Sequence, residues 1–499
     1  MSRNRIILVT AGIMLSLFLA SMESTVVATA MPTIVGQLGG LEHYSWVFSA
    51  YMLASTTTVP LYGKLSDLYG RRNLYLIAMA LFLTGSVLCG WANSMTQLIF
   101  ARALQGIGAG GIMPLAFILI GEMFSLEKRA KMQGYFSGVW GLSSIVGPLL
   151  GGFLVDQLSW RWIFYVNIVP GLLAASFVAF AWRDQILGRE KPSVDYAGAG
   201  LLMSGVVLLL LGLIEPGASG SWVLIAASIA VFLLLIRVES RAKDPILPLP
   251  LFRDRLFSTT IAHSALTGWA LFGSISFVPL FVQSVLNTSA MQAGITLTPL
   301  LLGWVGGSII STRIMLKVGY RRLGLFGTAS LVLGSLLLAQ SGVDTTQISL
   351  MIFVTLMGIG MGFSIPPFFI AVQSTVERRH LGTATSTIQF SRSMGGTLGV
   401  SVMGAALSAR LASNFSASNL DPSLVSQLLD PLPGSQVAID ESLRFALANA
   451  INIVFVIAFF AAALGLVSAF FAPRKELREN SGPVSPASKA EDPSLATAD

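Results

Sequence analysis

One glycine-rich stretch decides the fold, Leu104-Gln-Gly-Ile-Gly-Ala-Gly-Gly-Ile-Met-Pro114, because the chain contains it twice. The second copy begins 252 residues later and reads Leu356-Met-Gly-Ile-Gly-Met-Gly-Phe-Ser-Ile-Pro366. At the same offset Gly147 falls on Gly399. Glycines at every second position of a helix let neighbouring backbones approach closely, so chance similarity between two apolar segments is a poor explanation. The repeat predicts two duplicated halves.

The composition predicts a protein surrounded by lipid. Of the 499 residues, 54% are hydrophobic and only 11% are charged, and the mean hydropathy is +0.75. A soluble domain carries roughly a quarter charged residues. Apolar runs of about 20 residues, the length that a helix needs to cross a bilayer, recur along the chain. Since these runs show no alternation of polar and apolar residues, they exclude a membrane β-barrel and predict an all-α integral membrane protein.

The apolar runs predict fourteen transmembrane helices in two six-helix bundles with two helices inserted between them. The predicted spans are residues 6–30, 45–63, 74–92, 97–120, 132–154, 162–181, 197–214, 221–236, 257–282, 290–312, 321–340, 347–373, 383–408 and 446–471. The predicted domains are an N-terminal six-helix bundle (1–181), a linker with the two inserted transmembrane helices (182–256), a C-terminal six-helix bundle (257–472) and a disordered cytoplasmic tail (473–499). Two such halves usually enclose a binding site at the midplane of the membrane, which is typical of transporters.

The distribution of charge predicts how the chain is oriented. A pI near 9.6 would suit a nucleic-acid ligand, but most Lys and Arg residues fall in alternate loops and in the two tails. Only Arg161, Arg410 and Arg444 lie in the other set of loops. This positive-inside asymmetry predicts a multi-pass protein of the cell (cytoplasmic) membrane with both termini in the cytoplasm and no nucleic-acid partner.

Three motifs in the first half point to a family. The second and third spans are joined by Gly63-Lys-Leu-Ser-Asp-Leu-Tyr-Gly-Arg-Arg72. The fourth span contains Arg102-Ala-Leu-Gln-Gly-Ile-Gly108, and the fifth contains Gly147-Pro-Leu-Leu-Gly-Gly152. These segments resemble the signature loop, the fourth-helix motif and the antiporter motif of the major facilitator superfamily.

Two further motifs resemble those of the fourteen-helix drug:proton antiporters, which are multidrug efflux permeases. They are Leu19-Ala-Ser-Met-Glu-Ser-Thr-Val-Val27 with Met31-Pro32, and Trp160-Arg-Trp-Ile-Phe-Tyr-Val-Asn167. The resemblance implies a proton-coupled antiporter that exports small lipophilic or amphiphilic compounds by alternating access. It implies a proton gradient in place of a cofactor, the lipid bilayer and a small-molecule substrate as partners, and a monomer, with a periplasmic adaptor if the source has an outer membrane. The family usually has Asp where this chain has Glu23.

Glu23 is the one acidic residue, among 24, that is predicted to lie deep inside a span. A carboxylate at such a depth is usually paired, protonated or exposed to a wet cavity, which suits a proton carrier. By the rise of an α-helix, Glu23 and Arg102 both fall in the outer half of the bilayer. We therefore predict that Glu23 and Arg102 couple transport to protons; the alternative is a static pair that only packs the N-terminal half.

The signature loop is predicted to gate the transport cycle. The resemblance implies that Asp67 meets the start of a helix near Gly382-Thr-Ala-Thr385, where the helix dipole favours a carboxylate. Arg71 is expected to complete a charge cluster with Glu122 or Glu127. The full gating set comprises Gly63, Asp67, Gly70, Arg71, Arg72, Glu122 and Glu127. The alternative is a solvated loop that serves only topology. The second half lacks the acid, so the contact should be one-sided.

Residues of the antiporter motif are predicted to shape the contact between the halves. Pro148 removes a backbone hydrogen bond and should kink its helix. Gly147, Gly151 and Gly152 should then permit tight packing between the halves. Val400 replaces the proline in the second copy, which favours export by antiport; simple packing of small residues is the alternative.

The candidate substrate cavity contains Gln389, Arg392 and His263. Contact with cargo and pairing with backbone carbonyls suit Arg392 equally well, and a lone His is more often a hydrogen-bonded packing residue. Because the second half has no acid in mid-membrane, dedicated dicationic drugs are disfavoured. Lipophilic monocations, neutral amphiphiles and anions held by Arg392 remain open.

Three rival functions share part of this pattern. The first is export of a lipid or an endogenous metabolite on the same fold. A proton-driven nutrient importer does not explain the antiporter motif, and a non-transporting membrane sensor would need a folded output domain. Cys89 is the only cysteine, and no cluster of His, Cys and carboxylates indicates a metal site or an enzyme. The loop 412–445 is expected to lie on the outer leaflet or to cover the exit.

Overall fold

The computed structural model describes residues 2–39, 44–183, 195–214, 220–242, 245, 249–288, 290–377, 380–417 and 441–474. Across these ranges every regular element is helical and no strand occurs. Ten helices in the described ranges are long and apolar enough to cross a membrane. The predicted tail beyond residue 474, the centre of the predicted loop 412–445 and most of the first linker lie outside the described residues.

The helices of the first half follow one another through short connections, whereas in the second half residues 418–440, which lie outside the described ranges, separate the last two helices. The first half contains α1 (Arg3–Leu38), α2 (Tyr44–Tyr69), α3 (Arg71–Trp91), α4 (Met95–Met123), α5 (Leu126–Gln157), α6 (Trp162–Tyr165) and α7 (Ile168–Ala181). The inserted hairpin consists of α8 (Tyr196–Ile214) and α9 (Ser221–Glu239). The second half contains α10 (Arg255–Ser284), α11 (Ala290–Val318), α12 (Tyr320–Ala339), α13 (Gln347–Thr375), α14 (Leu381–Ala417) and α16 (Glu441–Phe470), preceded by a short 3-10 turn (Leu249–Arg253).

Several predicted spans differ from the structure; the span predicted at 383–408, for example, extends as α14 from Leu381 to Ala417. The first span was predicted at 6–30, but α1 continues to Leu38 and ends at Gly39, whose positive φ of 69° suits glycine. The sixth span was predicted as one helix, but it breaks at Val166 and Asn167 between α6 and α7. Pro170 explains the break, because it has no N–H to donate to the carbonyl of Val166 one turn earlier.

The glycine repeat has the same packing role in both halves. In α4, Gly106 and Gly110 lie against the backbone of α2, whereas Gly108 lies against α3. In α13, the matching Gly358 and Gly362 lie against α11, whereas Gly360 lies against α12. Spacing of two residues places alternate glycines on different sides of the helix, so each copy brings two neighbouring helices into close contact.

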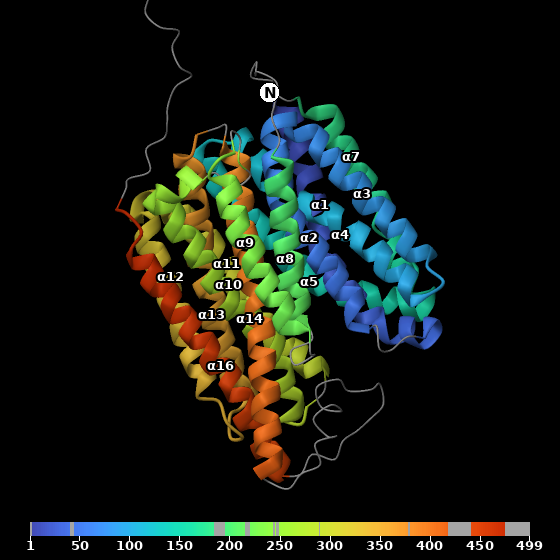
Figure 1. Ribbon diagram of the computed structural model, residues 1–499, viewed down its shortest axis with the longest axis vertical. Coiled ribbons are helices and arrows are strands. Elements are labelled where there is room, and N and C mark those ends of the chain that lie inside the picture. The colour runs from blue at the N-terminus through green and yellow to red at the C-terminus, as the bar shows by residue number, and fades with distance from the viewer. Residues whose placement is uncertain are drawn as a thin grey trace, which may run out of the picture.

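The two halves are joined at one end of the molecule. The blue and cyan helices of the first half diverge from the orange and red helices of the second half away from the end that carries the N-terminus (Figure 1). One hydrophobic core extends from the first half into Phe368, Phe369 and Ala384 of the second half. A separate core lies wholly within the second half. The joined end is therefore closed by apolar packing as well as by polar contacts.

The inserted hairpin packs beside the boundary between the halves (Figure 1). Val206 and Leu210 of α8 belong to a third hydrophobic core, together with Met394 of α14. Leu53 of α2 packs against the same core. Helix α8 thus contacts both halves, α2 on one side and α14 on the other.

Candidate functional site

The centre of the first half is a buried ion pair. Arg102 Nη1 lies 2.7 Å from Glu23 Oε1, and each side chain is only 1% exposed. Arg102 also donates from Nε to the carbonyl of Val47 at 3.2 Å and from Nη1 to Gln105 Oε1 at 2.7 Å. Its guanidinium lies 4.2 Å from the centre of the Tyr51 ring, a cation–π contact. Helices α1, α2 and α4 therefore all hold the charge of Arg102.

Asn167 completes the carboxylate environment. Its Nδ2 donates to Glu23 Oε2 at 2.7 Å. Asn167 lies in the turn between α6 and α7, directly before the start of α7, and this position brings its amide to the glutamate. Gln105 in turn donates to Ser86 Oγ at 2.8 Å. Both oxygens of Glu23 thus accept a short hydrogen bond, so the carboxylate has one defined orientation.

The sequence analysis did not single out Asn167, Gln105 or Ser86. Two signals were available. Gln105 stands three residues after Arg102 on the same helix, and positions at this spacing are neighbours on a helix surface. Asn167 is a polar residue inside an apolar run that Pro170 interrupts. Only the tertiary structure shows that these residues meet Glu23.

A second polar contact joins the two halves. Asp67, near the end of α2, accepts hydrogen bonds at the start of α14 from the backbone N–H of Gly382 at 3.1 Å and of Thr383 at 2.9 Å. The Thr383 hydroxyl adds a third at 3.1 Å. Burial raises the pKa of the Asp67 carboxyl, while Arg71 and the hydrogen bonds act in the opposite direction. The carboxylate lies where the positive end of the α14 dipole favours it.

Arg71 connects this contact to α4. It lies 2.8 Å from Asp67 and 3.1 Å from Glu122, and it donates to the carbonyl of Ser66 at 3.0 Å. Of the two acids offered by the sequence, the structure pairs Arg71 with Glu122; Glu127 is exposed in the first turn of α5. Gly70 has a φ of 94°, a value that favours glycine, which allows the sharp turn between α2 and α3. Helix α3 begins at the next residue, Arg71, and Arg72 lies in its first turn.

Gly63 sets how closely α2 and α14 approach. A Cβ on Gly63 would clash with the Ser386 side chain and would lie 2.8 Å from the carbonyl of Gly382. The opposite crossing, between α5 and α11, is looser: a Cβ on Gly134 would lie 3.2 Å from a side-chain carbon of Ile309. The two crossings between the halves therefore differ in both polarity and tightness.

The glycines of the antiporter motif do not have the predicted partners. Gly147 packs against Thr25 and Met22 of α1, within the same half, and a Cβ on Gly152 would meet no atom within 4 Å. Gly151 is buried. The prediction that Gly147 and Gly152 pack between the halves is therefore wrong for this conformation, because this part of α5 faces α1. Pro148 lies within α5, which remains one continuous helix; the predicted kink stays a prediction.

The three candidate cavity residues are not together. Arg392 Nη2 donates to Gln389 Oε1 at 2.5 Å, and Gln389 Nε2 lies 3.0 Å from Met113 Sδ of α4, in the other half. His263, by contrast, is 1% exposed. Its Nε2 lies 2.9 Å from Thr328 Oγ1, and its ring packs against Phe368. His263 is therefore a core residue of the second half, so the prediction that it lines the cavity is wrong.

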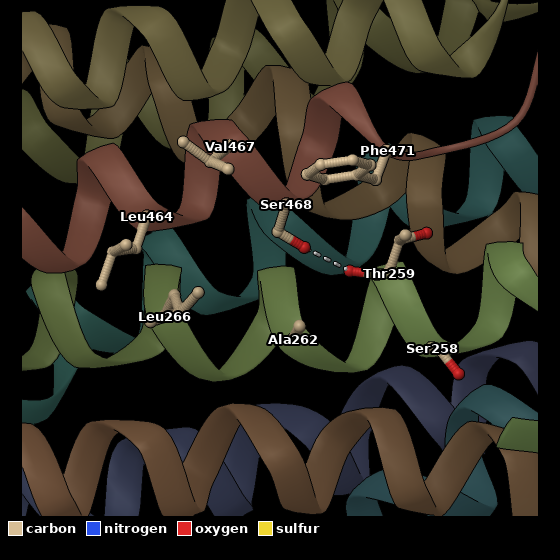
Figure 2. A pocket seen from close by; sticks show the side chains of 8 residues that line it. All are labelled: Ser258, Thr259, Ala262, Leu266, Leu464, Val467, Ser468 and Phe471. Carbon is tan, nitrogen blue, oxygen red and sulfur yellow. Dashed lines mark hydrogen bonds between the residues drawn. The ribbon is translucent and has the colours of Figure 1, made fainter.

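One open groove lies elsewhere, between α10 and α16, with a volume of about 450 Å³. Figure 2 shows its lining on two neighbouring helices, with Leu464, Val467, Ser468 and Phe471 along α16 and its end and Ser258, Thr259, Ala262 and Leu266 along α10. Ser468 donates to the carbonyl of Thr259 at 3.1 Å. None of the predicted site residues lines it. In the described residues no group of three or more His, Cys, Asp or Glu side chains could hold a metal ion.

These features define a class of protein: a multi-pass membrane transporter built from two duplicated helical halves that are joined at one end. The sequence matches the profile of the Major Facilitator Superfamily over residues 13–400. The chain belongs to the Major Facilitator Superfamily, and it is a transporter and not an enzyme.

Similar proteins of this family are known from bacteria. Multidrug transporter protein MdtP of Bacillus subtilis is 39% identical over 439 residues, which cover 86% of this chain and 79% of that protein. Multidrug resistance protein 3 of the same organism is 39% identical over 402 residues, covering 79% of this chain and 78% of that protein.

Solved structures share the fold. The crystal structure of the human organic anion transporter MFSD10 matches with a TM-score of 0.62 at 16% identity, covering 93% of this chain and 100% of that one. The structure of the proton:xylose symporter XylE matches with a TM-score of 0.59 at 14% identity, covering 95% of this chain and 97% of that one. At these identities the similarity concerns the fold alone.

Proposed function

We propose that this protein is a proton-coupled antiporter that exports small lipophilic or amphiphilic compounds by alternating access. The observation that carries the proposal is the buried pair of Glu23 and Arg102, each 1% exposed and 2.7 Å apart. An ionisable residue inside the membrane is by default a functional one. The relatives named as multidrug transporters support the choice of cargo.

Proton exchange at Glu23 is the coupling step. In the present arrangement Glu23 accepts from Arg102 and from Asn167, both at 2.7 Å, so the ionised carboxylate has its partners in place. Protonation removes the charge that Arg102 and Asn167 hold and weakens these bonds. Because the partners come from α4 and from the break between α6 and α7, the loss of charge changes how α1 packs against both.

Alternating access requires that the contacts between the halves at the joined end form and break during the transport cycle. Asp67 holds α2 to the start of α14 through three hydrogen bonds, and these bonds must separate when the halves open at that end. The opposite end opens when they form. The contact is one-sided, since Leu316 stands near the end of α11 where the first half has Asp67, when the two positive-φ glycines Gly70 and Gly319 are aligned.

The topology that we propose has fourteen spans. Helices α2, α5, α8 and α14 join the ten most apolar helices as membrane spans, although α2, α5 and α14 carry more polar residues and the apolar segment of α8, Ala197–Leu213, is shorter. Their polar residues pack inward, as Asp67 and Thr383 do. The positive-inside asymmetry then orients both termini to the cytoplasm of the cell membrane, and the joined end is the cytoplasmic one.

Reconstitution into liposomes with an imposed proton gradient tests the proposal. A panel of lipophilic cations, neutral drugs and lipids is assayed for movement against the proton flow. We expect Glu23→Gln to reduce the rate of gradient-driven export by at least about tenfold. The reason is that a single positioned acid or base commonly changes the rate of a step that depends on proton transfer by more than about tenfold. Glu23→Asp should retain coupling because it preserves the carboxylate.

A control variant and the rival outcomes show which result supports the proposal. Asp344 is an exposed acid in a connection of the second half, so Asp344→Asn should leave export unchanged. Full gradient-driven export by Glu23→Gln would remove the coupling role of Glu23. Export of lipids alone would favour the lipid or metabolite exporter. Uptake along the proton gradient would favour the nutrient importer.

A further inference from the structure

Arg392 differs from Arg102 because, among the residues that the structure describes, no acid forms an ion pair with it. It lies eleven residues after the start of α14, about 16 Å along the helix by the α-helical rise. That distance is close to the middle of a bilayer core about 30 Å thick. In the described part of the second half, Asp254, Asp344 and Glu377 all lie outside the helices or at their ends. The guanidinium charge therefore has a neutral partner, the Gln389 amide.

The backbone under Arg392 is held firmly in place. A Cβ on Gly268 of α10 would clash with the carbonyl of Arg392, and a Cβ on Gly395 would clash with the carbonyl of Ala265. In addition, the Ser391 hydroxyl donates to the carbonyl of Ile261 at 2.9 Å. Helix α14 is thus fixed against α10 on both sides of Arg392, so the guanidinium projects from a rigid support.

The surroundings of the guanidinium combine charge with adaptable apolar contact. Gln389 reaches Met113 of α4 at 3.0 Å, which places the pair at the boundary between the halves. A thioether adapts to ligands of different shape. Arg392 itself is only partly buried, whereas Arg102 is 1% exposed. The charge of Glu23 is already neutralised by Arg102 at 2.7 Å, so it leaves little net negative potential to repel an anion.

We propose that Arg392, oriented by Gln389, binds the acidic group of the cargo, so that the exported compounds include amphiphilic anions that carry a carboxylate or sulfonate. An uncompensated cation at this depth is costly, and an anionic cargo supplies the missing charge. The planar guanidinium suits a two-oxygen acid because it offers parallel N–H donors. This inference rests on the proposed export function and specifies the chemical class of its cargo.

A matched pair of fluorescent probes tests the proposal. Anilinonaphthalene sulfonate is an amphiphilic anion, and phenylnaphthylamine has nearly the same skeleton without the sulfonate. Export of both from proteoliposomes is measured with a proton gradient for the natural chain and for Arg392→Gln and Arg392→Lys. We expect Arg392→Gln to lower sulfonate export at least about tenfold relative to phenylnaphthylamine export, as the loss of a charge-assisted hydrogen bond predicts. Arg392→Lys should keep part of the preference.

The control variant lies on the same helix. Arg410 is exposed near the far end of α14, so Arg410→Gln makes the same change far along the helix from Arg392 and Gln389 and should leave the ratio of the two exports unaltered. The proposal that Arg392 binds the acidic group would be overturned by either of two results. The Arg392→Gln variant could export both probes at the rates of the natural chain, or it could lose export of both probes to the same extent. Sulfonate export that needs Arg392 but no proton gradient would overturn the coupling while the assignment of Arg392 stands.

Discussion

Arg102 in the first half and Arg392 in the second both lie inside the helical bundle, yet they have opposite surroundings. Arg102 is enclosed by a carboxylate, a backbone carbonyl, an amide and an aromatic ring. Arg392 has one neutral amide partner and is partly exposed. An arginine whose N–H groups are all paired within the protein stays in one place, whereas an arginine with unpaired N–H groups can bind a ligand. The two duplicated halves therefore differ in how they hold a buried arginine; under the proposals above, the first half serves proton exchange and the second binds the cargo.

The largest expected effect comes from removing each arginine in turn. Arg102→Met leaves the Glu23 carboxylate buried without its partner and should destabilise the fold by about 3–5 kcal/mol. Arg392→Met removes one hydrogen bond to a neutral amide, about 1 kcal/mol, and also relieves the cost of an uncompensated cation, so its net cost should be about 1 kcal/mol at most. The measurement is the unfolding free energy of each purified variant in the same detergent. Equal losses in the two variants would show that the comparison of the halves is wrong.

The double variant sharpens this result. Combining Arg102→Met with Glu23→Gln removes both charges, so it should be more stable than Arg102→Met alone, because breaking a buried pair costs more than replacing it. If the double variant is less stable than either single variant, the stability lost in Arg102→Met comes from lost packing and not from an unpaired charge.

The two crossings between the halves provide the next comparison. Gly63→Ala forces Ser386 or the start of α14 to move, and overpacking of this kind costs about 1–3 kcal/mol. Gly134→Ala meets Ile309 at 3.2 Å and should be accommodated by a small shift of that side chain. Access of a thiol reagent to a cysteine introduced at Thr383 reports opening at this end. We expect higher access for Gly63→Ala than for Gly134→Ala; the reverse order would mean that the α5 and α11 crossing is the tighter one.

The smallest effect concerns the polar part of the same crossing. Asp67→Asn keeps the shape but loses the charge that favours the start of α14, a loss of about 1–2 kcal/mol. Its matched control is Asp254→Asn, since Asp254 caps the start of α10 through the N–H of Phe257 at 2.9 Å within one half. Hydrogen exchange at the start of α14 should rise for Asp67→Asn. If it rises equally for both variants, Asp67 has no special role between the halves.

Much of the site could be read from the sequence because charged residues are rare in it. With so few candidates, Glu23 and Arg102 were natural partners, and Asp67 with the segment Gly382–Thr385 followed from the resemblance to a family. The choice between Glu122 and Glu127 could not be made, because both stand near the end of α4 and the start of α5. Asn167 and Gln105 escaped notice since uncharged amides are common, and only their contacts distinguish them.

Predictions that depended on the direction in which one face of a helix points were wrong more often than those based on charged residues. Gly147 was expected to contact the other half but packs against α1, and His263 was expected in a cavity but lies in a core. A helix that is apolar all round carries little periodic signal to indicate its buried side. The position of the inserted hairpin beside α2 and α14 was equally beyond the reach of the sequence.

The residues alone predict a helical membrane protein with duplicated halves. Lipid permits only helices or closed barrels, the apolar runs lack the alternation of a barrel, and the repeated glycines predict repeated close contacts between helices. Only the tertiary structure decided which residues share a site. Glu23, Arg102 and Asn167 come from three separate helical segments, and their meeting depends on helix rotation and on the break before Pro170. The distances between these three residues depend on how all the helices pack together, and no local pattern of residues predicts that packing.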